Sequence, residues 1–165
     1  MKYIYWDSNC FIGFLKGEEH GKDAILGVLH AVERGEAKLV TSAFTLVEVV
    51  KLKENPNRTA TSQSKSQRVE IEKCFGPDNG VIIVNVDIET ASKAREAVWD
   101  YGVDPKDAMH VGTALRFKEI YLNKGDEIVF QTFDKKLIKH ADGCGGIRFE
   151  EPDVANYPYQ MSADL

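Results

Sequence analysis

Short apolar runs rich in β-branched and aromatic residues recur along the chain, and they predict strands. These runs cover residues 3–6, 38–41, 81–86, 127–131 and 147–149. Between them, apolar residues recur every three or four positions, as on one face of a helix. The helices predicted in this way cover residues 9–16, 22–34, 43–53, 62–74, 89–101, 105–117 and 135–140. Because strands that alternate with helices are typical of a parallel sheet covered on both faces, we expect an α/β fold with a central, mostly parallel sheet.

Three local signals refine this pattern. The run VIIVNV at residues 81–86 is almost continuously apolar and follows a Gly-Pro-Asp-Asn-Gly turn, so we expect a strand buried on both faces. Pro105 suits the first turn of a helix, and Asp104 before it is the expected N-cap. Gly112 lies in mid-helix, where glycine costs about 1 kcal/mol relative to alanine, so we expect a close packing contact there.

Size and composition narrow the class of protein. The length of 165 residues fits one compact domain, and 28% charged residues are ordinary for a globular protein. A net charge of −5 argues against nucleic-acid binding through overall charge, and three cysteines without a CxxC pair support neither a disulfide framework nor a zinc site. Charged residues interrupt every apolar run before the roughly 18 residues of a membrane helix. The N-terminus lacks the order of a secretory signal, so we expect a cytoplasmic protein that does not span a membrane.

Four acidic residues occupy notable positions. Asp7 ends the first predicted strand, Asp134 follows the strand at 127–131, and Asp107 opens a helix. Glu48 lies among apolar helix residues, where a charge is poorly placed unless it faces a polar pocket. Each acid also has a simpler interpretation, as a helix cap or, for Glu48, as the partner of a lysine. Clustered carboxylates raise one another's pKa unless cations neutralise them, and hard oxygen ligands select Mg²⁺ or Mn²⁺.

The residues around these acids resemble those of the PIN domain, in the small form seen in VapC-like toxins. The resemblance rests on DSN at Asp7, TLVEVV around Glu48, DAMHVGTAL from Asp107 and TFDKKL around Asp134, in the family's order and spacing. It implies a PIN-like three-layer α/β/α sandwich over residues 1–149, followed by a C-terminal tail at 150–165. It also implies that these four acids are catalytic and bind the metal. The residues matched as supporting ones are Ser8, Asn9, Asp104 and Thr132.

Asp104 and Asp107 compete for the place of the inner metal ligand, and the DAxHxxTA pattern favours Asp107. His110 lies one helical turn after Asp107 on the same face. We interpret it as a semi-buried helix histidine and do not adopt the alternative, a hydrogen-bond donor behind the acids or a general base.

The resemblance implies a Mg²⁺- or Mn²⁺-dependent endoribonuclease, the toxin of a toxin–antitoxin pair. Its partners would be an RNA substrate, an antitoxin protein and, in a homodimer, a second copy. The alternative is a catalytically inactive PIN-like module that binds RNA or protein. A phosphatase of the haloacid-dehalogenase type ranks below both, because that family needs a second Asp two residues after the first, where this chain has Asn9.

One segment is basic against an acidic background. Residues 51–73 hold six basic and three acidic residues, while the whole chain carries −5. We expect this segment to lead RNA phosphates toward the metals, and the alternative is a solvated helix face. The residues proposed for RNA binding are Lys51, Lys53, Arg58, Lys65 and Arg68.

Overall fold

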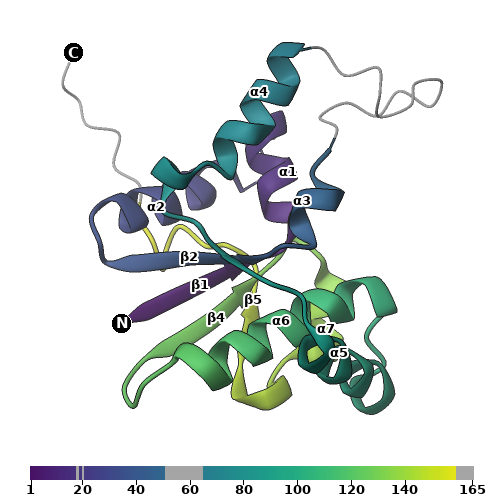
Figure 1. The fold of residues 1–165 in the computed structure, drawn as a ribbon. Coiled ribbons are helices and arrows are strands. Elements are labelled where there is room, and N and C mark those ends of the chain that lie inside the picture. Colours follow the sequence, from purple (N-terminus) through teal and green to yellow (C-terminus); the bar gives the residue numbers. More distant parts are fainter. Residues whose placement is uncertain (18, 20, 51–64, 159–165) are drawn as a thin grey trace.

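The computed structural model describes the chain apart from residues 18, 20, 51–64 and 159–165 (Figure 1). Its centre is a five-stranded sheet with the order β3-β2-β1-β4-β5, in which every neighbouring pair is parallel. The strands are β1 (Lys2–Trp6), β2 (Ala37–Ser42), β3 (Ile82–Val84), β4 (Glu127–Gln131) and β5 (Arg148–Glu150). Central β1 places Ile4 opposite Leu39 of β2 and Val129 of β4. The predicted α/β fold with a parallel sheet is confirmed.

Helices cover both faces of the sheet (Figure 1). The helices among the described residues are α1 (Ser8–Lys16), α2 (Lys22–Glu33), α3 (Thr45–Glu48), α4 (Lys65–Cys74), α5 (Ile88–Tyr101), α6 (Pro105–Tyr121) and α7 (Lys135–Ala141), with 3₁₀ turns η2 (Pro77–Asn79) and η3 (Cys144–Gly146). Helices α1, α2 and α4 lie on one side of the sheet, and α5, α6 and α7 lie on the other (Figure 1). None of the helices in the described ranges is long and apolar enough to cross a bilayer.

The two-residue period of β1 builds both halves of the core. Ile4 and Trp6 pack into a cluster with α1 and α2, whereas Tyr5 packs into the cluster with α5, α6 and α7. All three side chains are fully buried. Because successive residues of a strand point to opposite faces, the uninterrupted apolar run at the N-terminus is what a strand covered on both faces requires.

Three local expectations need correction. The run at 81–86 forms only the three-residue strand β3 at the sheet edge, with Ile82 partly exposed, because an apolar run does not reveal how many neighbours its strand will have. The helix predicted from residue 43 spans only Thr45–Glu48, since Val49 leaves helical geometry at φ −86° and ψ 66°. Asp104 occupies the N-cap position of α6 as predicted, but its side chain makes no capping hydrogen bond. Its carboxylate instead pairs with Lys136 at 2.7 Å.

Close backbone approaches explain two glycines. A Cβ at Gly112 would lie 2.5 Å from the carbonyl oxygen of Thr90, so α6 lies directly against α5 as expected. Gly27 of α2 similarly leaves room for the backbone of Tyr157, whose side chain is 6% exposed and belongs to the α1–α2 core cluster. The described part of the C-terminal tail therefore packs back onto the domain.

Candidate metal centre at the carboxyl edge of the sheet

Asp7 lies at the end of central β1 and is 2% exposed. Its Oδ1 caps α1 by accepting hydrogen bonds from the backbone N–H groups of Asn9 (3.0 Å) and Cys10 (3.3 Å). Its Oδ2 accepts from the Thr132 hydroxyl at 2.5 Å and from the Asn9 amide at 3.4 Å. Burial raises the pKa of Asp7, and these hydrogen bonds only partly offset it. Asp7 therefore caps a helix and also presents a buried carboxylate at the sheet edge.

Glu48 ends α3 and turns inward, with a side chain that is 7% exposed. Its Oε1 lies 2.7 Å from the ammonium of Lys106, and its Oε2 lies 2.5 Å from Nε2 of buried His110. The other ring nitrogen of His110 is 3.1 Å from the hydroxyl of Tyr5 on β1. Burial raises the pKa of Glu48, but the hydrogen bonds from His110 and Lys106 outweigh it and lower the pKa overall.

The remaining acids come from α6 and from the turn after β4. Burial raises the pKa of half-buried Asp107, and the negative charges of Asp134 and Asp104 raise it further. Asp134 caps α7, because its Oδ1 accepts from the backbone N–H groups of Lys136 (2.8 Å) and Leu137 (3.0 Å). Asp104 is exposed, and its hydrogen bond with Lys136 lowers its pKa. Asp107 therefore lies within electrostatic range of Asp134, the acid that follows β4.

Lys106 interacts electrostatically with Glu48 and also with Asp107 and Asp7. Its pKa is raised mainly by the hydrogen bond to Glu48, and the charges of Asp107 and Asp7 raise it further. One ammonium is therefore held in the electrostatic field of three carboxylates from three elements. Donor chemistry and charge at this edge fit a hard divalent cation. Within the described ranges, however, no three His, Cys, Asp or Glu side chains gather closely enough to hold a metal ion together, because Glu48 faces Lys106 and His110 while Asp7 and Asp134 cap helices.

The other proposed site residues fall into two groups. Asn9 and Thr132 contact the Asp7 carboxylate, and Ser8 is buried in the first turn of α1. Of the proposed RNA-binding residues, Lys65 and Arg68 are exposed on α4. Lys51, Lys53 and Arg58 lie outside the described residues.

Sequence reasoning missed Lys106 of α6 and did not adopt a site role for His110. Lys106 and His110 lie four positions apart on one helix face and bind the two oxygens of Glu48. His110 is 2% exposed and hydrogen-bonds on both ring nitrogens, so it is an integral part of this site and not a semi-buried helix residue. The four-residue spacing of Lys106 and His110 places both side chains on one helix face, and this spacing could have revealed their shared role.

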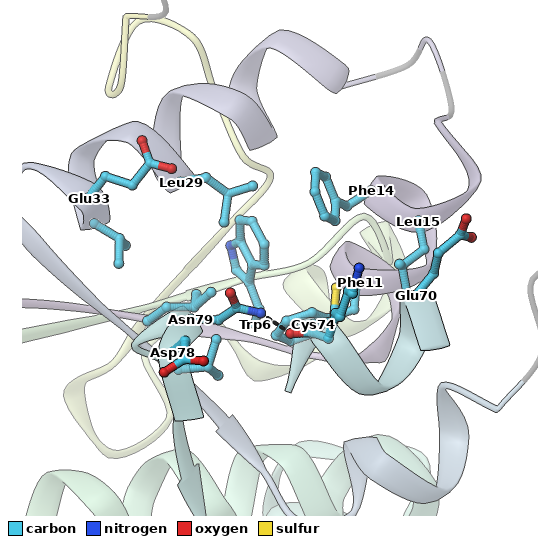
Figure 2. Close-up of a pocket in the computed structure, with 14 residues that line it drawn as sticks. Trp6, Phe11, Phe14, Leu15, Leu29, Glu33, Glu70, Cys74, Asp78 and Asn79 are labelled. Carbon is cyan, nitrogen blue, oxygen red and sulfur yellow. Dashed lines mark hydrogen bonds between the residues drawn. The ribbon is translucent and has the colours of Figure 1, made fainter. Parts of the chain in front are cut away.

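An apolar groove of about 450 Å³ lies on the other side of β1, between α1, α2 and the end of α4 (Figure 2). Trp6 forms its floor, with Phe11 of α1 and Leu29 of α2 beside it (Figure 2). The rim is mostly acidic, because Glu33, Glu70 and Asp78 outnumber Lys73. This combination suits an apolar segment with basic flanks.

Comparisons with known proteins agree on one fold. The family model described as the PIN domain matches residues 4–143. VapBC2 from Rickettsia felis, solved with a DNA fragment from its promoter, is similar over 93% of this chain and 100% of that chain, with a TM-score of 0.60 and 14% identity. A toxin–antitoxin complex from Klebsiella pneumoniae is similar over 91% of this chain and 98% of that chain, with a TM-score of 0.57 and 17% identity. DNA-bound VapBC from Salmonella typhimurium is similar over 93% of this chain and 100% of that chain, with a TM-score of 0.54 and 17% identity. No curated protein sequence matches the chain significantly.

Proposed function

Because this chain belongs to the PIN domain family, we propose that it is a Mg²⁺- or Mn²⁺-dependent endoribonuclease that hydrolyses RNA phosphodiester bonds. The observation that carries the proposal is the shared electrostatic field of the acids at the carboxyl edge of the sheet. The charges of Glu48, Asp107 and Asp7 raise the pKa of Lys106. The charge of Asp134 contributes to the raised pKa of Asp107. A parallel sheet opens its ligand crevice at this edge, so the four carboxylates are where a substrate would enter.

Each acid has a defined task in this proposal. Asp7, Glu48, Asp107 and Asp134 would hold the metal, which when bound would supply an activated water molecule and charge stabilisation for the leaving oxygen of the phosphodiester. Thr132 and Asn9 fix the orientation of Asp7 through hydrogen bonds to Oδ2. His110 fixes Glu48, since its Nε2 can only donate to a carboxylate oxygen. These partners limit the reorganisation that the acids need when a cation binds.

The test is cleavage of a structured RNA by the purified protein. We expect cleavage with Mn²⁺, none after addition of EDTA, and none by Asp7→Asn with Mn²⁺. Asp100→Asn is the matched control, because it makes the same charge change at an exposed aspartate on α5 that is not one of the four proposed metal ligands. Absence of Mn²⁺-dependent cleavage by the parent protein would reject the nuclease.

The observation that favours the alternative, an inactive binding module, is the pairing of Glu48. Lys106 and His110 already occupy both carboxylate oxygens, and no three acids in the described part of the chain converge as a preformed metal cage. Mn²⁺ titration separates the two functions. If the protein is a nuclease, it should bind Mn²⁺ saturably, and Asp7→Asn should weaken that binding. If it is a binding module, it should bind RNA or protein without binding Mn²⁺.

We further propose that the protein is a cytoplasmic toxin restrained by an antitoxin. Support comes from the similar structures, which are toxin–antitoxin and VapBC complexes, and from the groove of Figure 2 with its apolar floor and acidic rim. We expect the antitoxin to lay an apolar segment with basic flanks in the groove and to place an arginine between the carboxylates, where its fork of donors pairs bidentately.

Growth of a bacterial host tests the toxin. Expression of the parent protein should slow growth, Asp7→Asn should not, and co-expression of the protein encoded by the adjacent reading frame should restore growth. Glu33→Lys with Asp78→Lys should weaken that rescue without changing RNA cleavage, because both residues line the groove and not the acidic edge. Equal growth with the parent and Asp7→Asn would reject toxicity.

A further inference from the structure

A second groove, of about 560 Å³, borders the acidic edge between α1 and the start of α7. One wall is a single face of α1, because Asn9, Ile12, Gly13 and Lys16 recur at helical spacing. The other wall is the continuous segment from Phe133 to Lys136. The groove therefore joins two elements that each begin at a strand end beside the acids.

The inner end of this groove touches the candidate metal centre. Asn9 lines the groove, and its side-chain amide donates to Asp7 Oδ2. On the opposite wall, Asp134 lines the groove and its backbone N–H donates to the Thr132 hydroxyl, which itself donates to Asp7. A chain lying in the groove would therefore contact Asp134 and lie beside the residues that hold Asp7.

The walls carry cationic and aromatic groups in an acidic protein. Among the described residues that line the groove, Lys16, Lys135 and Lys136 stand against one aspartate, although the whole chain carries −5. The side chain of Lys135 is 82% exposed and 3.6 Å from Glu151, and that of Lys136 is 67% exposed and pairs with Asp104. Exposed ion pairs of this kind are weak, so a phosphate can replace the carboxylate at little cost. The ring of Phe133 adds an aromatic surface among these ammonium groups.

We propose that this groove binds a single-stranded segment of the RNA, with its phosphates on Lys16, Lys135 and Lys136 and one base against Phe133. The proposal rests on the proposed nuclease function, because it places the scissile region at the acids of the sheet edge. Single-stranded RNA fits better than a duplex, since only an unpaired, splayed base can stack on a side chain. The site differs from the described part of the basic segment at residues 51–73, because none of the described residues that line it comes from that segment.

Binding of a fluorescein-labelled single-stranded oligoribonucleotide, followed by fluorescence anisotropy in EDTA, tests the groove without cleavage. Lys16→Ala with Lys135→Ala should weaken binding by about tenfold at low salt and reduce the slope of log K against log salt by about 1.4, since each single-strand phosphate contact contributes about 0.7. Lys124→Ala with Lys139→Ala is the matched control, because it removes two exposed lysines outside the groove and should change the slope little.

The ring of Phe133 needs a separate variant. Phe133→Leu should weaken binding about fivefold and leave the salt slope unchanged, because loss of base stacking removes no charge. The ring also packs against Gly21, so the thermal unfolding midpoint is measured beside the affinity. RNA affinity equal to that of the parent overturns the base contact on Phe133.

The outcomes separate the groove from the nuclease. A lysine double variant that binds RNA with the affinity and salt slope of the control pair overturns the groove, even if the parent cleaves RNA. Equal competition by duplex and single-stranded RNA overturns the assignment to a single strand. Lysine-dependent RNA binding by a parent that fails to cleave with Mn²⁺ leaves the groove standing and overturns the nuclease.

Discussion

The ammonium of Lys106 lies 2.7 Å from Oε1 of Glu48, and its charge also interacts with Asp7 and Asp107. A cation supplied by the chain thus neutralises acids that a metal ion would neutralise from outside. The side chain of Lys106 is 67% exposed, so it can withdraw into solvent without disturbing the core. A divalent metal ion bound at this edge would therefore compete with Lys106 for the same negative field.

Lys106→Met should bind Mn²⁺ about tenfold more tightly than the parent, because the competing charge is removed while much of the side-chain stem remains. Isothermal titration with Mn²⁺ at pH 7 measures the change directly. Lys124→Met, which removes an exposed lysine between α6 and β4, should leave the affinity unchanged. If Lys106→Met binds Mn²⁺ more weakly than the parent, Lys106 helps to hold the metal-bound site and does not compete with the ion.

Asp7→Asn should abolish Mn²⁺-dependent cleavage and leave the metal-free fold equally stable or slightly more stable. The carbonyl oxygen of Asn can still cap α1, while the cost of a buried charge disappears. The raised pKa of Asp7 means that the folded parent loses stability as pH rises from about 4 through that pKa. Thermal unfolding from pH 4 to 8 should show the advantage of Asp7→Asn growing with pH. If Asp7→Asn instead unfolds at a much lower temperature than the parent, the role of Asp7 is mainly to cap α1.

Gly112→Ala should destabilise the protein by about 2 kcal/mol, although alanine is the better helix former. The new Cβ would lie 2.5 Å from the Thr90 carbonyl oxygen and 2.8 Å from the Ala94 backbone nitrogen, so α5 and α6 must separate. Urea unfolding measures the loss. Gly76→Ala is the control, because its Cβ would come no closer than 3.5 Å to its neighbours.

Secondary structure and the order of the acids were predictable, whereas the contacts between elements were not. Asp7 follows an apolar strand, and its N-cap geometry depends only on the next three residues, so local sequence reveals both. The contact between Glu48 and His110 joins residues 62 positions apart and depends on how α3 and α6 pack on the sheet. The edge position of β3 likewise depends on strand order, which local hydrophobicity does not encode.

Lys65→Ala with Arg68→Ala tests the basic segment at residues 51–73. If α4 guides the RNA backbone, this pair should flatten the salt dependence of RNA binding by about 1.4, as expected for two single-strand phosphate contacts. Both residues are exposed on a helix without buried residues, so the fold should be unaffected. An unchanged salt slope would show that α4 is a solvated face.

Trp99→Glu should convert the predicted homodimer into a monomer. Trp99 and Ile88 are 70% and 77% exposed, and they lie 11 positions, or about three turns, apart on one face of α5. Light scattering coupled to size-exclusion chromatography measures the mass in solution. Ile120→Glu is the control, because it places the same charge on an exposed apolar residue of α6. A dimer with both variants would place the interface elsewhere.

The hydrogen bond from Thr132 to Asp7 closes a loop of 125 positions in the sequence. Central β1 is made first, yet its partner β4 and the hydroxyl that holds Asp7 are among the last parts of the domain to leave the ribosome. Such long-range pairing makes folding slow compared with that of helical domains. A nascent chain therefore carries three of the four proposed metal ligands, Asp7, Glu48 and Asp107, before it can arrange them, and the activity proposed here would appear only when translation of the domain is complete.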